Sequence, residues 1–217
     1  MRAAPSSIAI DGPAASGKST VSRVLAKRCG YHFLDTGLMY RAFALAALRA
    51  GVPATEEACA RFVAEVELRI GEELEAHVYL GSEDVTNKLH NRELEAHVSS
   101  YARLAPVRQA LIERQRAYAA RWRAVLAGRD IGEVVLPDAP LKIYLDADEN
   151  ARARRRNSER GIGHQGEARQ SQQALSRRDR LDAAQTYLAS GAVVIDTSAL
   201  TLEEVIERVL GLAACEG

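Results

Sequence analysis

Nine consecutive residues near the N-terminus have the types and the spacing of a phosphate-binding loop. They fit the pattern G-x-x-x-x-G-K-[ST]. The two glycines let the backbone curl, so that successive N–H groups point at one anion. The Lys18 ammonium can then reach the β- and γ-phosphates of a nucleoside triphosphate, and the Ser19 hydroxyl can ligate Mg²⁺. The pattern predicts a triphosphate site made of Gly12, Pro13, Ala14, Ala15, Ser16, Gly17, Lys18, Ser19 and Thr20.

The segments on either side of this loop support the prediction. Residues 7–10 are typical of a short buried strand, and Val21, Val24 and Leu25 recur at helical spacing. Strand, glycine loop and helix therefore come in the order that such a site needs, and the helix N-terminus adds partial positive charge. A glycine-rich turn between a strand and a helix, with no ligand, is the alternative.

Further strands alternate with helices along the chain. Residues 31–35, 125–127, 141–146 and 192–196 are apolar and predict four more strands. The last predicted helix opens with a capping box of Thr201 and Glu204, and its spacing buries Leu202, Val205, Ile206 and Val209. This alternation predicts an α/β fold in which helices cover both faces of a five-stranded parallel sheet. Ligands of such sheets bind at the carboxyl ends of the strands, where Gly12, Asp35, Arg129 and Asp130 follow.

Composition excludes some partners. The 217 residues carry a formal net charge of zero, which argues against general binding to nucleic acids or membrane surfaces. No apolar run approaches the roughly 20 residues of a membrane helix, and residues 1–7 lack the features of a signal peptide. Cys29, Cys59 and Cys215 are dispersed, which favours free thiols in a reducing compartment. We therefore expect a cytoplasmic protein without a nucleic-acid or membrane partner.

Two other features bear on the reaction. Arg41, Arg108 and Arg129 could bind a second phosphate, because guanidinium groups suit that geometry. Residues 152–180 are rich in arginine and contain three glycines, so they could close over a triphosphate as a lid. A solvated charged helix is the alternative for any single arginine there.

These features favour a small phosphoryl-transfer kinase over other triphosphate-binding proteins. A kinase needs an acceptor site, positive charge between the two sites and a lid that excludes water. A GTPase switch needs an aspartate three residues before a glycine, and no aspartate here has that spacing. A motor or transporter ATPase usually has a longer chain. A kinase for another acceptor, such as UMP or a sugar acid, and an ATP-sensing adaptor both stay open.

Several segments, taken together, resemble the bacterial cytidylate kinase family. They are residues 8–20, 35–41, 128–132, 137–139 and 141–145, and the similarity runs in order along nearly the whole chain. The resemblance implies a P-loop NTPase fold and ATP-dependent phosphorylation of CMP and dCMP by a monomer with Mg²⁺. It also implies one kinase domain over residues 1–217. Its core would comprise residues 1–35, 124–151 and 186–217, its monophosphate-binding region residues 36–123 with a small antiparallel β-insertion at about 66–85, and its lid residues 152–185.

The resemblance also implies residue roles. Asp130 would accept from the exocyclic amine of cytosine, since a carboxylate can accept there and uracil has a carbonyl instead. Ser19 would hold the metal. The catalytic residues would be Lys18, Arg129, Arg152, Arg156 and Arg178, and the acceptor would be bound by Asp35, Thr36, Tyr40, Arg41, Ser99, Arg108, Arg129, Asp130, Arg178 and Asp182.

This chain departs from the family pattern at Gln185, where the family has an arginine, and the segment 185–191 is a few residues short. Structural roles are the alternatives for several of the assigned residues. Asp35 could cap the next helix, Tyr40 could pack in the core, and Asp130 could pair with Arg129 or Arg178. Ser99 and Arg108 could be ordinary helix-surface residues.

Overall fold

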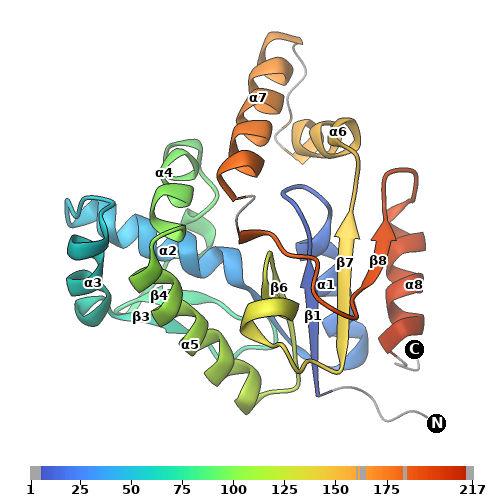
Figure 1. The fold of residues 1–217 in the computed structure, drawn as a ribbon, viewed down its shortest axis with the longest axis horizontal. Coiled ribbons are helices and arrows are strands. Elements are labelled where there is room, and N and C mark those ends of the chain that lie inside the picture. The colour runs from blue at the N-terminus through green and yellow to red at the C-terminus, as the bar shows by residue number, and fades with distance from the viewer. Residues whose placement is uncertain (1–5, 160, 162–164, 183–184, 214–217) are drawn as a thin grey trace.

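A five-stranded parallel sheet forms the centre of the computed structural model, which describes residues 6–159, 161, 165–182 and 185–213. The strand order is β2-β6-β1-β7-β8 (Figure 1). The predicted α/β class and the five strands are confirmed. The strands are β1 (Ser7–Asp11), β2 (His32–Asp35), β6 (Ala124–Gly128), β7 (Leu141–Asp146) and β8 (Val193–Asp196).

The two central strands are buried along their whole length, because helices cover both faces of the sheet. On one face, α1 (Lys18–Cys29) and α8 (Leu202–Ala213) pack with Ile8, Ile10 and Val125 into one apolar cluster. On the other face, α2 (Thr36–Arg49) and α5 (Ala105–Arg121) pack with Ala9 and Leu126 into a second cluster. The packed sheet therefore holds the carboxyl ends of its strands in fixed positions relative to one another.

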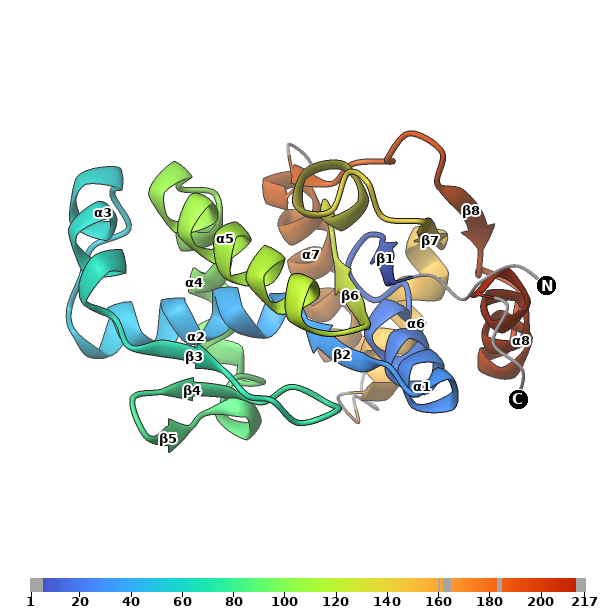
Figure 2. The same cartoon turned by 90° about the horizontal axis from the view of Figure 1, so that it is seen from below.

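The second cluster extends into a region beside the sheet (Figure 2). This region contains α3 (Glu56–Glu65), the predicted small antiparallel sheet and a helix α4 (Arg92–Ala102). The antiparallel strands are β3 (Leu68–Ile70), β4 (Val78–Leu80) and β5 (Glu83–Asp84), and a short helix η1 (Thr86–Lys88) follows them. Helix α5 follows α4 closely and has Pro106 in its first turn, a position that favours a helix start.

Two helices lie beyond the carboxyl ends of the strands, where we expected a lid (Figure 1). They are α6 (Glu149–Glu159) and α7 (Gln165–Asp182). A π-helical turn, η2 (Ile131–Val135), follows β6 and lies under the same edge of the sheet. The boundaries that we assign to core, monophosphate-binding region and lid stay a prediction.

Helix α8 begins with the predicted capping box. The Glu204 N–H donates to the Thr201 hydroxyl oxygen at 3.3 Å, and the Thr201 N–H donates to the Glu204 carboxylate at 2.7 Å. The predicted burial of Leu202 is wrong, because this side chain is 48% exposed. It lies in the first turn of the helix, beside the edge strand β8, which is itself exposed at Val193 and Val194.

The cysteines only partly follow the expectation of free thiols. Cys59 is free and buried, whereas Cys29 is disulfide-bonded, and Cys215 lies outside the described residues. Within the described ranges, no helix is both long enough and apolar enough to cross a membrane.

Candidate active site

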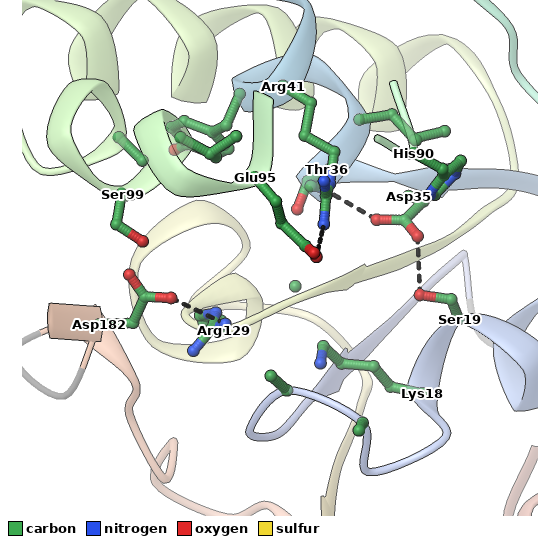
Figure 3. Close-up of a pocket in the computed structure, with 18 of the residues that line it drawn as sticks. Lys18, Ser19, Asp35, Thr36, Arg41, His90, Glu95, Ser99, Arg129 and Asp182 are labelled. Atoms are coloured by element: carbon green, nitrogen blue, oxygen red, sulfur yellow. Dashed lines mark hydrogen bonds and ion pairs between the residues drawn. The ribbon is translucent and has the colours of Figure 1, made fainter. Parts of the chain in front are cut away.

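A cleft of about 720 Å³ opens at the carboxyl ends of β1, β2 and β6. The phosphate loop lines one end of it, and the other walls come from α2, α4, α5, the turn after β6 and the lid helices (Figure 3). Six cationic side chains and four carboxylates line this cleft, so it is both strongly charged and net positive. They are Lys18, Arg23, Arg41, Arg108, Arg129, Arg156, Asp35, Glu95, Asp130 and Asp182.

The backbone of the phosphate loop has the shape that its glycines require. Gly12 has φ +153°, and a Cβ there would lie 2.2 Å from the Leu145 carbonyl oxygen. Gly17, with φ +91°, caps α1, and Ala15 is also left-handed with φ +59°. The Lys18 Nζ lies over the loop and donates to the Pro13 carbonyl at 2.8 Å. Of the nine predicted loop residues, Ala14, Ala15, Gly17, Lys18, Ser19 and Thr20 line the cleft.

Ser19 and Asp35 meet at the base of the cleft. The Ser19 hydroxyl donates to Asp35 Oδ2 at 2.7 Å, and Asp35 Oδ1 accepts from the Gly37 N–H at 3.0 Å as the N-cap of α2. Asp35 therefore does cap the helix, as the structural alternative had it, and it also lines the cleft. Hydroxyl and carboxylate oxygens are hard ligands that suit Mg²⁺, so this pair fits the expected metal.

Asp11 is a buried carboxylate that our sequence reasoning missed. It accepts from the Ile131 and Gly132 N–H groups at 2.8 Å each, and so ties β1 to the turn that carries Arg129 and Asp130. Burial raises the pKa of Asp11 to about 6, against the lowering effect of these two hydrogen bonds. A charged residue at the end of an otherwise apolar strand was the signal that could have identified it.

Another part of the cleft contains an ion pair between Arg108 of α5 and Asp130 after β6. Both side chains line the cleft and are largely buried. The Gln185 Oε1 accepts from Arg108 Nη1 at 3.4 Å. The partner of Asp130 here is thus Arg108 and not Arg129, and the side chain of Arg178, the other partner named in the structural alternative, lies outside the described residues. Arg129 instead pairs with Asp182 at 2.8 Å, again at the wall of the cleft (Figure 3).

A second residue that we missed is Glu95 of α4. Its Oε1 accepts from Arg41 Nη2 at 3.0 Å and also forms an ion pair with Arg156 of the lid helix α6. Burial acts to raise the pKa of Glu95, but the charges of Arg156 and Arg41 outweigh it and lower this pKa to about 2. Glu95 lies one helical turn before Ser99 on the same face, and this spacing was the signal available in the sequence.

Three more predicted acceptor residues line the cleft with different partners. The Thr36 hydroxyl is buried and donates to the Ala127 carbonyl at 2.8 Å, at the end of β6. The side chain of Tyr40 lies near Arg108 and Asp130, and burial raises the pKa of its phenol to about 12. Ser99 is buried on α4 and faces the same space as Asp182 (Figure 3).

The predicted lid arginines are in different positions. Arg156 lines the cleft, whereas Arg152 contacts the phosphate loop from outside it, with Nη1 3.3 Å from the Ala14 carbonyl oxygen and an ion pair to Asp179. The side chain of Arg178 lies outside the described residues. Among the predicted catalytic residues, Lys18, Arg129 and Arg156 therefore share one cleft.

Residues 8–214 of this chain match a family model described as cytidylate kinase. The chain belongs to the cytidylate kinase family. The cytidylate kinase of Herpetosiphon aurantiacus is 42% identical over 219 residues, which cover 98% of this chain and 96% of that protein. That of Pelotomaculum thermopropionicum is 42% identical over 211 residues, covering 94% and 93%. Among solved structures, a shikimate kinase from Acinetobacter baumannii is 16% identical with a TM-score of 0.46, covering 96% of this chain and 92% of that one.

Membership of the cytidylate kinase family confirms the resemblance stated on the sequence and the expectation of a kinase with ATP as a substrate. The roles of individual residues stay predictions. The phosphate loop and the Arg108–Asp130 pair line the same cleft. Arg41, Arg129 and Arg156 also line it.

Proposed function

We propose that this protein transfers the γ-phosphoryl group of ATP to CMP or dCMP, giving ADP and the corresponding diphosphate. The observation that carries the proposal is the single cleft in which a phosphate loop faces the Arg108–Asp130 pair. One chain lines both ends of this cleft, so we propose a monomer as the active unit. Cytoplasm is the compartment that we propose, since ATP and nucleoside monophosphates are available there.

The ATP end is formed by the phosphate loop. Backbone N–H groups of residues 12–20 would surround the β-phosphate, and Lys18 would exchange its contact with the Pro13 carbonyl for the β- and γ-phosphates. This exchange trades a neutral acceptor for an anionic one, which forms the stronger hydrogen bond. Arg152, which contacts the loop at Ala14, would support it from the lid side.

The acceptor end would recognise cytosine by its donor and acceptor pattern. Asp130 would accept from the exocyclic amine, and Arg108 would donate to the ring nitrogen and carbonyl. The ion pair between them holds both groups in place before the base arrives. Asp182, paired with Arg129, would hold the ribose hydroxyls beside Ser99, and Arg41 would bind the acceptor phosphate.

Transfer would be direct, without a covalent enzyme intermediate. An oxygen of the acceptor phosphate would attack the γ-phosphorus in line with the leaving ADP. Lys18, Arg129 and Arg156 would balance the charge that two polyanions bring into one cleft, and alignment of the reactants supplies much of the rate. Mg²⁺ would be held by Ser19 and Asp35 and would neutralise charge on the transferred phosphate.

Gln185 makes this chain different from the family pattern. Its amide carbonyl accepts from Arg108, where the family has an arginine side chain with a positive charge. A hydrogen bond from the neutral amide of Gln185 to the acceptor would be weaker by about 1 kcal/mol than one from an arginine at this position. We therefore expect the affinity for the acceptor to be several-fold lower than with arginine.

A coupled assay for ADP release tests the proposal. The purified protein is given ATP, Mg²⁺ and one acceptor at a time: CMP, dCMP, UMP, AMP, GMP, gluconate or shikimate. We expect rapid ADP release with CMP and dCMP and at least about tenfold lower kcat/KM with UMP. A preference for UMP or a sugar acid would show that the proposed acceptor is wrong. ATP binding without acceptor-dependent ADP release would show that the protein is a nucleotide sensor and not a kinase.

A further inference from the structure

Glu95 joins three parts of the molecule at one oxygen atom. It projects from α4 into the cleft, and its Oε1 contacts Arg41 of α2 and Arg156 of the lid helix α6 (Figure 3 shows the contact with Arg41). All three side chains line the cleft and are mostly buried, with 9%, 15% and 20% of the Arg41, Glu95 and Arg156 side chains exposed. Water therefore screens this cluster poorly.

The two guanidinium groups need an anion between them. Two like charges that contact one oxygen lie within hydrogen-bond reach of a common point, where repulsion in a poorly hydrated site is strong. Glu95 stays ionised there, since Arg156 and Arg41 lower its pKa to about 2 in spite of its burial. A negative charge at this point offsets that repulsion and so favours the approach of Arg156 to Arg41.

The proposed function places the acceptor phosphate where this carboxylate lies. Arg41 is the residue to which we assign the acceptor phosphate, and Arg156 is the lid arginine that lines the cleft. A phosphate held by both arginines would make the contacts that the Glu95 Oε1 makes in the nucleotide-free chain. A phosphate dianion and a carboxylate therefore compete for one pair of cations.

We propose that Glu95 is a positioning residue that takes the place of the acceptor phosphate: its carboxylate holds Arg41 and Arg156 together until the phosphate displaces it. The lid helix α6 is thus attached to α4 before the acceptor binds. Its Arg156 then already lies where the acceptor phosphate is proposed to bind. This inference rests on the proposed function for the identity of the displacing phosphate, but the attachment itself does not depend on any substrate.

The test compares Glu95→Gln with the matched control Glu93→Gln. Gln keeps the shape of Glu95 and its acceptor oxygen and removes only the charge. Glu93 lies on the same helix, is exposed and is not among the residues that line the cleft. Hydrogen exchange of the α6 amides is measured without nucleotide, then with inorganic phosphate. We expect exchange of α6 to rise about tenfold in Glu95→Gln only, and phosphate to restore most of the protection.

Steady-state kinetics adds a second readout. Loss of the competing carboxylate should lower the KM for CMP severalfold in Glu95→Gln, while kcat changes little at saturating CMP, where the phosphate itself holds the two arginines. A purely structural role would instead lower stability and leave the KM for CMP unaffected. If Glu95→Gln does not fold, Arg156→Gln replaces it in the exchange measurement only, because this variant keeps the Arg41–Glu95 pair and removes the lid cation. Exchange of α6 should then rise without recovery on addition of phosphate, and unchanged exchange would contradict the attachment.

Unchanged α6 exchange in Glu95→Gln, or an increase in that variant that phosphate does not reverse, would overturn the inference. The ADP-release assay on the wild-type protein is independent of this result. If CMP does not stimulate ADP release but the exchange result is as expected, the acceptor assignment is wrong and the Glu95 attachment stands. If CMP does stimulate ADP release but the exchange result is not as expected, the acceptor assignment stands and the Glu95 attachment is wrong.

Discussion

At the scale of single residues, the cleft is organised by ion pairs that leave polar atoms facing the space between them. Arg108 and Asp130 hold each other, as do Arg129 and Asp182, and all four line the cleft. Each pair is partly buried, so its geometry is better fixed than that of an exposed pair. These side chains are therefore in position before a nucleotide enters, which lowers the ordering cost of binding.

Lys18→Ala tests the phosphate end of the cleft. The ammonium group is expected to stabilise the negative charge on the phosphoryl group during its transfer. Its loss should therefore lower kcat by at least about a hundredfold. The fold should be retained, because the Lys18 side chain lies over the loop and contacts the Pro13 carbonyl rather than the core. Steady-state kinetics and far-UV circular dichroism check both parts, and near-normal turnover would contradict the role given to Lys18.

Asp130→Ala tests the acceptor end. Removing the carboxylate leaves Arg108 without its main partner and cytosine without an acceptor for its amine. We expect kcat/KM for CMP to fall by about a hundredfold or more while the KM for ATP changes less than about threefold. Asp138→Ala, at an exposed aspartate that does not line the cleft, is the control. Equal losses for CMP and ATP would remove Asp130 from the acceptor site.

At the scale of elements, strand ends and helix starts place the reacting groups. Strand β1 leads into the phosphate loop and α1, and β2 leads into Asp35 and α2. Helices α5 and α6 contribute side chains to the same cleft. Two backbone features hold this junction together: the tight passage at Gly12 past the Leu145 carbonyl and the hydrogen bonds from η2 to Asp11.

Gly12→Ala tests the strand–loop junction. The added methyl group would lie 2.2 Å from the Leu145 carbonyl oxygen in the adjacent strand, so the loop must move away from β7. We expect a stability loss of about 2 kcal/mol and a rise in the KM for ATP of at least about tenfold. Urea unfolding and ATP titration measure these effects. Gly211→Ala on α8, where a Cβ meets no atom within 4 Å, should show neither.

At the scale of the whole molecule, stability should depend on the protonation of Asp11. The pKa of Asp11 is raised by burial to about 6 from an ordinary value of 3.8, so the folded protein binds a proton more tightly than the unfolded chain. This group's stabilising contribution is complete below the unfolded pKa and is lost as pH rises through the folded value. Between pH 5 and pH 7, the loss amounts to roughly 1 kcal/mol.

Urea unfolding of the wild type and of Asp11→Asn across this pH range isolates the contribution. The free energy of unfolding should fall more steeply with pH in the wild type than in Asp11→Asn, by roughly that 1 kcal/mol in total. Asn is expected to lower stability at pH 5. The Ile131 and Gly132 N–H groups donate to different oxygens of Asp11, and in Asn an NH2 donor replaces one of these oxygens. Parallel pH curves for the two proteins would show that Asp11 does not titrate in this range.

Local patterns were enough to predict the sheet, the loop and the antiparallel insertion, because each depends on residues close in sequence. The spacing of Gly12, Lys18 and Ser19, together with the strand and helix on either side, predicted a phosphate loop. Glu95 and Asp11 were missed because their roles come from partners 61 and 120 residues away. Arg108 was not foreseen as the partner of Asp130 for the same reason, since charge alone does not select among several arginines. Leu202 followed the helical period but lies where the neighbouring strand gives little cover.

The most direct test of the central claim is a crystal structure with CMP and a non-hydrolysable ATP analogue bound together. The account predicts the triphosphate on the loop of residues 12–20, cytosine against Arg108 and Asp130, and an acceptor phosphate oxygen about 3–3.5 Å from the γ-phosphorus. Arg41 and Arg156 should then contact the CMP phosphate in place of Glu95. A monophosphate bound elsewhere, with Arg41, Arg108 and Arg129 touching neither nucleotide, would contradict the account.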